Sequence, residues 1–78
     1  FELRLLGMRY EEAIKALQKQ LDLCAIHNFK DFSVIHGKGN GVLQQAVQET
    51  LKKYSCVKEF HFARPEDGGF GKTYVTLW

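Results

Sequence analysis

The 78-residue chain is long enough for a single domain, and its hydrophobic content of 45% supplies one compact core and argues against disorder. Its formal net charge is only +2, so a polyanionic partner would need cations that are gathered in one place. No apolar stretch approaches the roughly 20 residues of a membrane span and no signal-peptide pattern opens the chain, so we expect a cytoplasmic protein.

The N-terminal part of the chain predicts a strand followed by a helix. Glu2–Leu6 alternates weakly and stops at Gly7, as a short strand does. From Tyr10 to His27 the apolar residues recur every three or four positions, which indicates an amphipathic helix that ends at a left-handed Asn28. The expected buried stripe of this helix is Ala13, Ile14, Leu17, Leu21 and Cys24.

The rest of the chain predicts three more strands and one more helix. Phe32–Ile35 is typical of a buried strand, Val42–Tyr54 of an amphipathic helix, and Val57–Phe62 of a third strand. After a turn-rich segment that starts at Arg64, Tyr74–Trp78 alternates as a fourth strand. The fold class is therefore α/β, in the form of an α+β two-layer sandwich with the order β-α-β-α-β-β and a four-stranded mixed sheet. The expected buried side of the second helix is Leu43, Ala46, Val47, Leu51 and Tyr54.

Two further features describe the setting of the domain. The chain begins with Phe1 and not with Met, so we expect residues 1–78 to be one domain cut from a longer polypeptide. Cys24 and Cys56 lie far apart and form no C-x-x-C pattern, so we expect two free thiols in a reducing compartment.

Topology predicts that three loops meet at one edge of the sheet. Two strand–helix–strand connections make the first three strands parallel, and the short last link makes the fourth antiparallel. The loops Gly7–Arg9, His36–Gly41 and Arg64–Gly71 then lie together at the carboxyl ends of the parallel strands, where open sheets bind ligands. We call these three loops the strand-end rim. It carries glycine amides and the side chains of Arg9, His36, Lys38, Arg64 and Lys72.

The loop from His36 to Gly41 is the most informative stretch of the rim. Its alternate glycines let the backbone approach a ligand closely, and it runs into a helix N-terminus, which favours an anion. His36 could act as a general acid or base, and Lys38 could neutralise a phosphate. The alternative interpretation is a glycine-rich turn with a structural histidine.

Other motifs carry less information. The run Gly71-Lys72-Thr73 is no nucleotide-binding P-loop, because Glu66 stands at the required first glycine and a strand follows. Gly68-Gly69 fits a turn and a functional loop equally well. No set of His, Cys, Asp and Glu has the spacing of metal ligands, so no structural zinc is expected. The residues expected to be structural or solvated are His27, His61, Glu66, Asp67, Arg4 and Lys58.

The segments Leu3–Arg9, His36–Gly41 and Gly68–Gly71 resemble, in order and spacing, the motifs of the Smr (small MutS-related) domain. The resemblance covers almost the whole chain. Gly7-Met8-Arg9 is more similar to the Smr domain at the C-terminus of the bacterial MutS paralogue than to stand-alone Smr proteins. The resemblance implies a fold like the C-terminal domain of translation initiation factor three, with the fourth strand between the second and third. It also implies DNA-nicking endonuclease activity in suppression of homologous recombination, or RNA cleavage and rescue of collided ribosomes.

The resemblance also assigns roles to residues. His36 matches the histidine of the family's loop motif, which implies a catalytic role, and Lys38 matches its lysine. The residues expected to bind nucleic acid are Arg9, Gly37, Lys38, Gly39, Gly41, Arg64 and Lys72. Arg4 departs from the family pattern, because it stands where the first motif has an acidic residue. The chain therefore lacks a possible base or metal ligand at this position and has instead an arginine that could bind phosphate.

The expected partners follow from the same resemblance. They are branched or duplex DNA, or else RNA or the ribosome, with no membrane partner and with a parent protein that is a homodimer carrying an ATPase domain. No cofactor is expected in this domain, although cleavage could use a divalent metal. Two rival hypotheses stay open at this point: a non-catalytic module that docks on RNA or the ribosome, and a protein-interaction domain whose glycine rim is only architectural.

Overall fold

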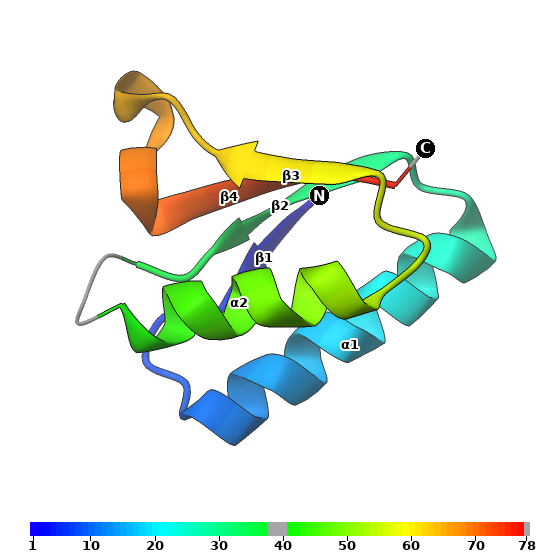
Figure 1. Ribbon diagram of the computed structural model, residues 1–78, viewed down its shortest axis with the longest axis horizontal. Helices are drawn as coiled ribbons and strands as arrows, with labels where there is room; N and C mark the ends of the chain where they lie inside the picture. Colours follow the sequence, from blue (N-terminus) through cyan, green and yellow to red (C-terminus); the bar gives the residue numbers. More distant parts are fainter. Residues whose placement is uncertain (38–40, 78) are drawn as a thin grey trace.

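The computed structural model describes residues 1–37 and 41–77, and in these ranges it has two layers, with both helices packed on one face of a four-stranded sheet (Figure 1). Two short 3-10 helices, η1 and η2, lie between the last two strands. The bounds are β1 Glu2–Arg4, α1 Tyr10–His27, β2 Asp31–Ile35, α2 Val42–Lys53, β3 Glu59–Phe62, η1 Pro65–Asp67, η2 Gly69–Gly71 and β4 Lys72–Thr76. The predicted class and element order are confirmed.

The strand order in the sheet is β1-β2-β4-β3. β1 is parallel to β2, and β4 is antiparallel to both β2 and β3, so β1, β2 and β3 point the same way. The prediction of an antiparallel fourth strand inserted between the second and third is confirmed. β4 begins at Lys72 and not at Tyr74, because Lys72 pairs with Ile35 and its carbonyl accepts a bond from the Ala63 N–H at 2.9 Å.

Helix α1 has the predicted bounds and the predicted end. Asn28 has φ 58°, and the N–H of Phe29 reaches back to the Cys24 carbonyl at 3.0 Å, which closes the last turn. Gln20 is buried in place of Ile14, which is half-buried. The Gln20 amide donates to the Cys24 sulfur at 3.3 Å, so this buried polar side chain has a partner.

The core lies between the helices and the covered face of the sheet. Residues that are paired across the strands share a face, so Leu3, Val34 and Thr73 point toward the helices. The fully buried apolar side chains include Leu5, Leu17, Leu21, Val34, Val47, Leu51 and Val75, and the larger Phe32 is 3% exposed. Helix α2 also buries Thr50, which its apolar pattern did not indicate, while Leu43 and Tyr54 are half-buried.

In the part of the chain that the structure describes, no α-helix covers the other face of the sheet (Figure 1). Its central row is Glu2, Ser33, Tyr74 and His61, which pair side by side across the four strands. No helix in the described residues is long and apolar enough to cross a membrane. Cys24 and Cys56 are both free thiols, as predicted.

Candidate functional site

The described parts of the three predicted rim loops lie at the same end of the sheet, on the left in Figure 1. The Gly71 carbonyl accepts hydrogen bonds from the N–H groups of His36, at 3.1 Å, and Gly37, at 2.9 Å, so the second and third loops are joined directly. The first loop follows Leu5, whose N–H donates to the Ile35 carbonyl at 2.8 Å and whose carbonyl accepts from the Met8 N–H at 3.1 Å. The predicted convergence of the loops is therefore confirmed for the part of the rim that the structure describes.

His36 lies inside this junction and not on its surface. Its side chain is buried, with an exposed fraction of 3% for the residue. Nδ1 lies 2.9 Å from the Gly37 carbonyl, which can only accept, so Nδ1 carries the hydrogen. Nε2 lies 2.7 Å from the hydroxyl oxygen of Thr73, and in the neutral ring it accepts from that hydroxyl. Both ring nitrogens are thus engaged, and in this arrangement the imidazole fixes the loop and is not presented to a ligand.

Gly37 is required for two reasons. Its φ is 76°, in the left-handed region where a residue with a side chain is strained. A Cβ at this position would also come within 2.7 Å of Leu6 Cδ2. The backbone of Gly37 therefore forms part of the surface between the first and second loops.

The remaining loop residues are placed as follows. Gly41, with φ 84°, is the N-cap residue of α2, and no side chain in the described ranges caps that end. Anion binding at this helix N-terminus stays a prediction. Lys38 and Gly39 lie outside the described residues.

A hollow of about 500 Å³ opens beside Gly37 of the second loop and the third loop. It is lined by residues from β1, from the ends of β2 and β4 and from the third loop, and we call it the rim hollow. Three glycines form part of its wall, so that backbone is open to a ligand there. The lining includes Arg4, Gly37, Gly68, Gly71, Asp67 and Lys72.

The charges of the rim hollow are arranged around Glu2. One carboxylate oxygen of Glu2 lies 3.2 Å from the Lys72 ammonium and the other 3.5 Å from Arg4 Nε. The hydrogen bond from Lys72 lowers the pKa of Glu2, and the same bond raises the pKa of Lys72. The Lys72 ammonium also lies 5.2 Å from the centre of the Tyr74 ring. Lys72 is therefore held at the hollow with its charge shared, whereas the Arg4 side chain is 76% exposed.

The family resemblance had already indicated Arg4 as a possible phosphate ligand, whereas Glu2 was not assigned to the rim from the sequence. Alternation places Glu2 and Arg4 on the same face of β1. The strand register pairs Arg4 with Ile35 on β2, and Ile35 pairs on its other side with Lys72 on β4. The register, and not the local pattern, brings these charges together. Arg9 and Arg64 are exposed N-cap residues, of α1 and η1, and neither lines the rim hollow.

The described residues offer no ready metal site, since they hold no cluster of three or more His, Cys, Asp and Glu side chains that could bind a cation. Two carboxylates, those of Glu2 and Asp67, line the rim hollow, and Glu2 is paired with Lys72.

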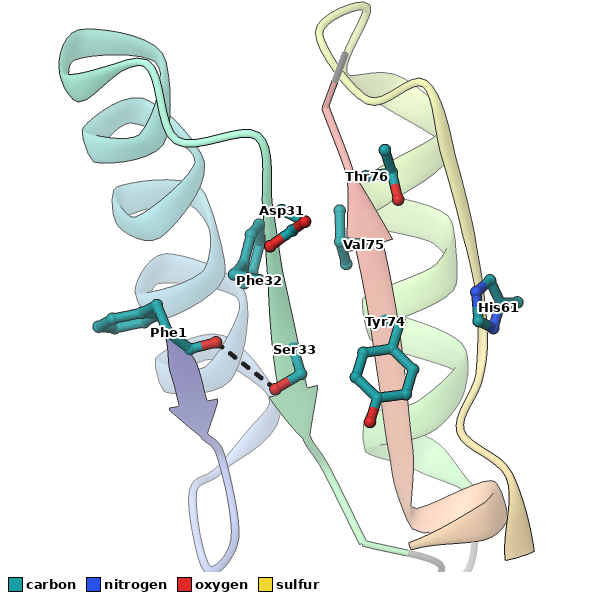
Figure 2. Close-up of a pocket in the computed structure, with 8 residues that line it drawn as sticks. All are labelled: Phe1, Asp31, Phe32, Ser33, His61, Tyr74, Val75 and Thr76. Atoms are coloured by element: carbon teal, nitrogen blue, oxygen red, sulfur yellow. Dashed lines mark hydrogen bonds between the residues drawn. The ribbon is translucent and has the colours of Figure 1, made fainter. Parts of the chain in front are cut away.

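A second hollow, of about 510 Å³, lies on the open face of the sheet (Figure 2). Tyr74 and His61 flank it, with their rings tilted and 5.7 Å apart, and His61 is otherwise bonded to the Phe62 carbonyl. Its described lining has no Lys or Arg and includes the carboxylate of Asp31. The rim hollow is therefore the better candidate for an anionic ligand.

Comparison with known proteins agrees with this geometry. A family model described as the Smr domain matches residues 3–78. The protein named Endonuclease MutS2 of Staphylococcus carnosus is 50% identical over 97% of this chain, and that of Staphylococcus epidermidis is 46% identical over the same share. The chain spans about a tenth of the length of these curated relatives.

Two solved structures have the same fold. The Smr domain of Thermus thermophilus MutS2 superposes with a TM-score of 0.89 at 33% identity, covering 100% of this chain and 95% of that one. YdaL, a stand-alone small MutS-related protein from Escherichia coli, gives a TM-score of 0.91 at 27% identity, covering 97% of this chain and 63% of that one. The similarity therefore extends over both layers of the fold.

Proposed function

The chain belongs to the Smr domain family, and from that premise we propose that it binds nucleic acid at the strand-end rim, as one domain of a MutS2-type protein. The observation that supports this most is the rim hollow itself. Beside the carboxylates of Glu2 and Asp67, its wall combines glycine backbone with Arg4 and Lys72, and cationic side chains and backbone N–H groups both favour phosphate binding. The binding that we propose is to the phosphodiester backbone, with the phosphate entering beside Gly37 and Gly71.

Arg4 is the main cation available to such a phosphate. Its guanidinium is exposed and donates through a planar fork, which suits two phosphate oxygens at once. Lys72 would bind more weakly as long as Glu2 shares its charge. The exposed Arg9 and Arg64 extend the cationic surface beyond the hollow and would contact neighbouring phosphates.

Cleavage is the second part of the proposal. The relatives are named endonucleases, and we propose DNA nicking for the whole protein, in which this domain would act on DNA during recombination. His36 is the candidate for acid–base transfer. For this role its imidazole would have to release the Thr73 hydroxyl, because a base must lie within hydrogen-bond reach of the proton that it takes.

The test measures binding and nicking side by side. The affinity of the chain for DNA and RNA of matched sequence is measured over a range of salt concentrations, and nicking is measured on supercoiled plasmid. We expect the affinity to fall steeply with salt, because phosphate contacts release counterions. Binding that does not respond to salt would contradict the proposal, and tighter binding of RNA than DNA would favour the RNA alternative. Nicking that is unchanged in H36A would exclude catalysis by His36.

A further inference from the structure

Phe70 is a large exposed side chain at the strand-end rim whose orientation is nevertheless fixed. The residue is 63% exposed and lies in η2, between Gly69 and Gly71. Its ring meets that of Phe62 edge to face, with centroids 5.1 Å apart and an interplanar angle of 90°. The Phe70 carbonyl accepts a hydrogen bond from the side-chain amide of Gln44 at 3.3 Å. An aromatic ring is thus held at the surface by two other elements.

A separate small hollow of about 410 Å³ lies against Phe70. We call it the Phe70 hollow. Its other described lining residues are Ala63, Pro65, Gly68 and Gly69, and none of these carries a charge. A flat, ring-sized apolar group could lie against Phe70 there, because aromatic rings attract one another by stacking.

The Phe70 hollow and the rim hollow share one wall. Gly68 lines both of them, and a Cβ at Gly68 would come within 3.2 Å of the Lys72 Cβ. The Gly68 backbone therefore lies beside both the rim hollow, whose wall holds Arg4 and Lys72 together with Glu2 and Asp67, and the apolar hollow beside the Phe70 ring. A ligand that carries a phosphate and a flat base a short distance apart matches this pair of hollows.

We propose that Phe70 stacks on an unpaired nucleobase, so that the chain prefers nucleic acid with single-stranded nucleotides to blunt duplex. This inference rests on the proposed function, because it needs the backbone phosphate to be bound in the rim hollow. Bases in a duplex are paired and stacked on each other, and only an unpaired base can turn toward a side chain. Stacking on an aromatic ring accepts every base, so the preference is for single-stranded structure and not for sequence.

The experiment compares two probes and three variants. The probes are a fluorescently labelled blunt duplex and the same duplex with a single-stranded tail of thymidines. The variants are F70L, which removes the ring but stays apolar, F70W, which keeps a stacking surface, and F29L as a matched control. Phe29 is another exposed aromatic residue, which follows α1 and lies away from the rim.

We expect the unsubstituted chain to bind the tailed probe more tightly than the blunt one. F70L should weaken binding to the tailed probe by about fivefold or more, since stacking contributes that much per base, and leave the blunt probe unchanged. F70W and F29L should bind like the unsubstituted chain. Two results would overturn the inference and leave the proposed function standing. One is equal affinity of the unsubstituted chain for both probes. The other is an F70L effect that is absent or that is the same on both probes. If neither probe binds in a salt-dependent way, both fail.

Discussion

The hydrogen bond between His36 and Thr73 should be a measurable part of the stability of the domain. Nε2 of His36 lies 2.7 Å from the Thr73 hydroxyl, and the two residues are 3% and 1% exposed. T73V keeps the shape of the side chain but leaves Nε2 buried without its partner. An unsatisfied buried group costs about 1–3 kcal/mol. For a domain of this size, the melting temperature should therefore fall by roughly 4–20 °C.

Thermal and urea unfolding, followed by far-ultraviolet circular dichroism, measures this loss. T76V is the matched control, because Thr76 lies on the same strand, is half-exposed and points to the open face of the sheet. We expect that control to change stability by less than about 0.5 kcal/mol. A double-mutant cycle with H36A then isolates the coupling, which should account for most of the loss. If T73V costs as much in the H36A background as in the original chain, the hydrogen bond does not hold the loop.

Three further outcomes follow from the rim. G7A should lower the free energy of unfolding by about 1–2 kcal/mol through its positive φ alone, and G37A should lower it by roughly 1 kcal/mol more, because its Cβ meets Leu6. Urea unfolding of G7A, G37A and G37A/L6A checks this. The double variant should return to the level of G7A. E2Q should strengthen nucleic-acid binding several-fold in an anisotropy titration, because it frees Lys72, whereas E59Q at the other end of the sheet should have little effect. The pKa of Glu2 is lowered in the folded chain, so its ion pair stabilises the fold above the ordinary pKa of 4.5 and is lost as the pH falls through the lowered value. The melting temperatures of E2Q and the unsubstituted chain should therefore converge as the pH falls below 4.5, and a constant difference would refute this.

The sequence predicted the elements well wherever local periodicity decides the structure. The bounds of α1 and its left-handed end at Asn28 follow from apolar spacing and one terminating residue. Gln20 and Thr50 were not predicted to be buried, because a helical pattern identifies the buried face of a helix by its apolar residues and so passes over polar ones. A polar residue can occupy the buried face when a neighbour forms a hydrogen bond with it, as the Cys24 sulfur does by accepting from the Gln20 amide.

The site was predictable as a region but not as a set of contacts. Topology alone places the three loops at one edge, and the hydrogen bonds of Gly71 agree with it. The burial of His36 depends on Thr73, which is 37 residues away, and the pairing of Glu2 with Lys72 joins residues 70 apart. Such contacts depend on the register of the strands, which local patterns do not fix. His36 remains a predicted catalytic residue, and its two hydrogen bonds define what catalysis would have to break.

The most direct test of the proposed interface is to locate bound nucleic acid on the chain. Backbone amide signals of the ¹⁵N-labelled chain are followed by nuclear magnetic resonance while a tailed DNA duplex is added. We predict that the largest shifts fall at Leu6–Arg9, at Gly37 and at Gly68–Lys72, where the three loops meet. Residues at the opposite end of the sheet, Asn28–Lys30 and Ser55–Lys58, should change little. Shifts concentrated at that opposite end, or on the open face around Tyr74 and His61, would contradict binding at the strand-end rim.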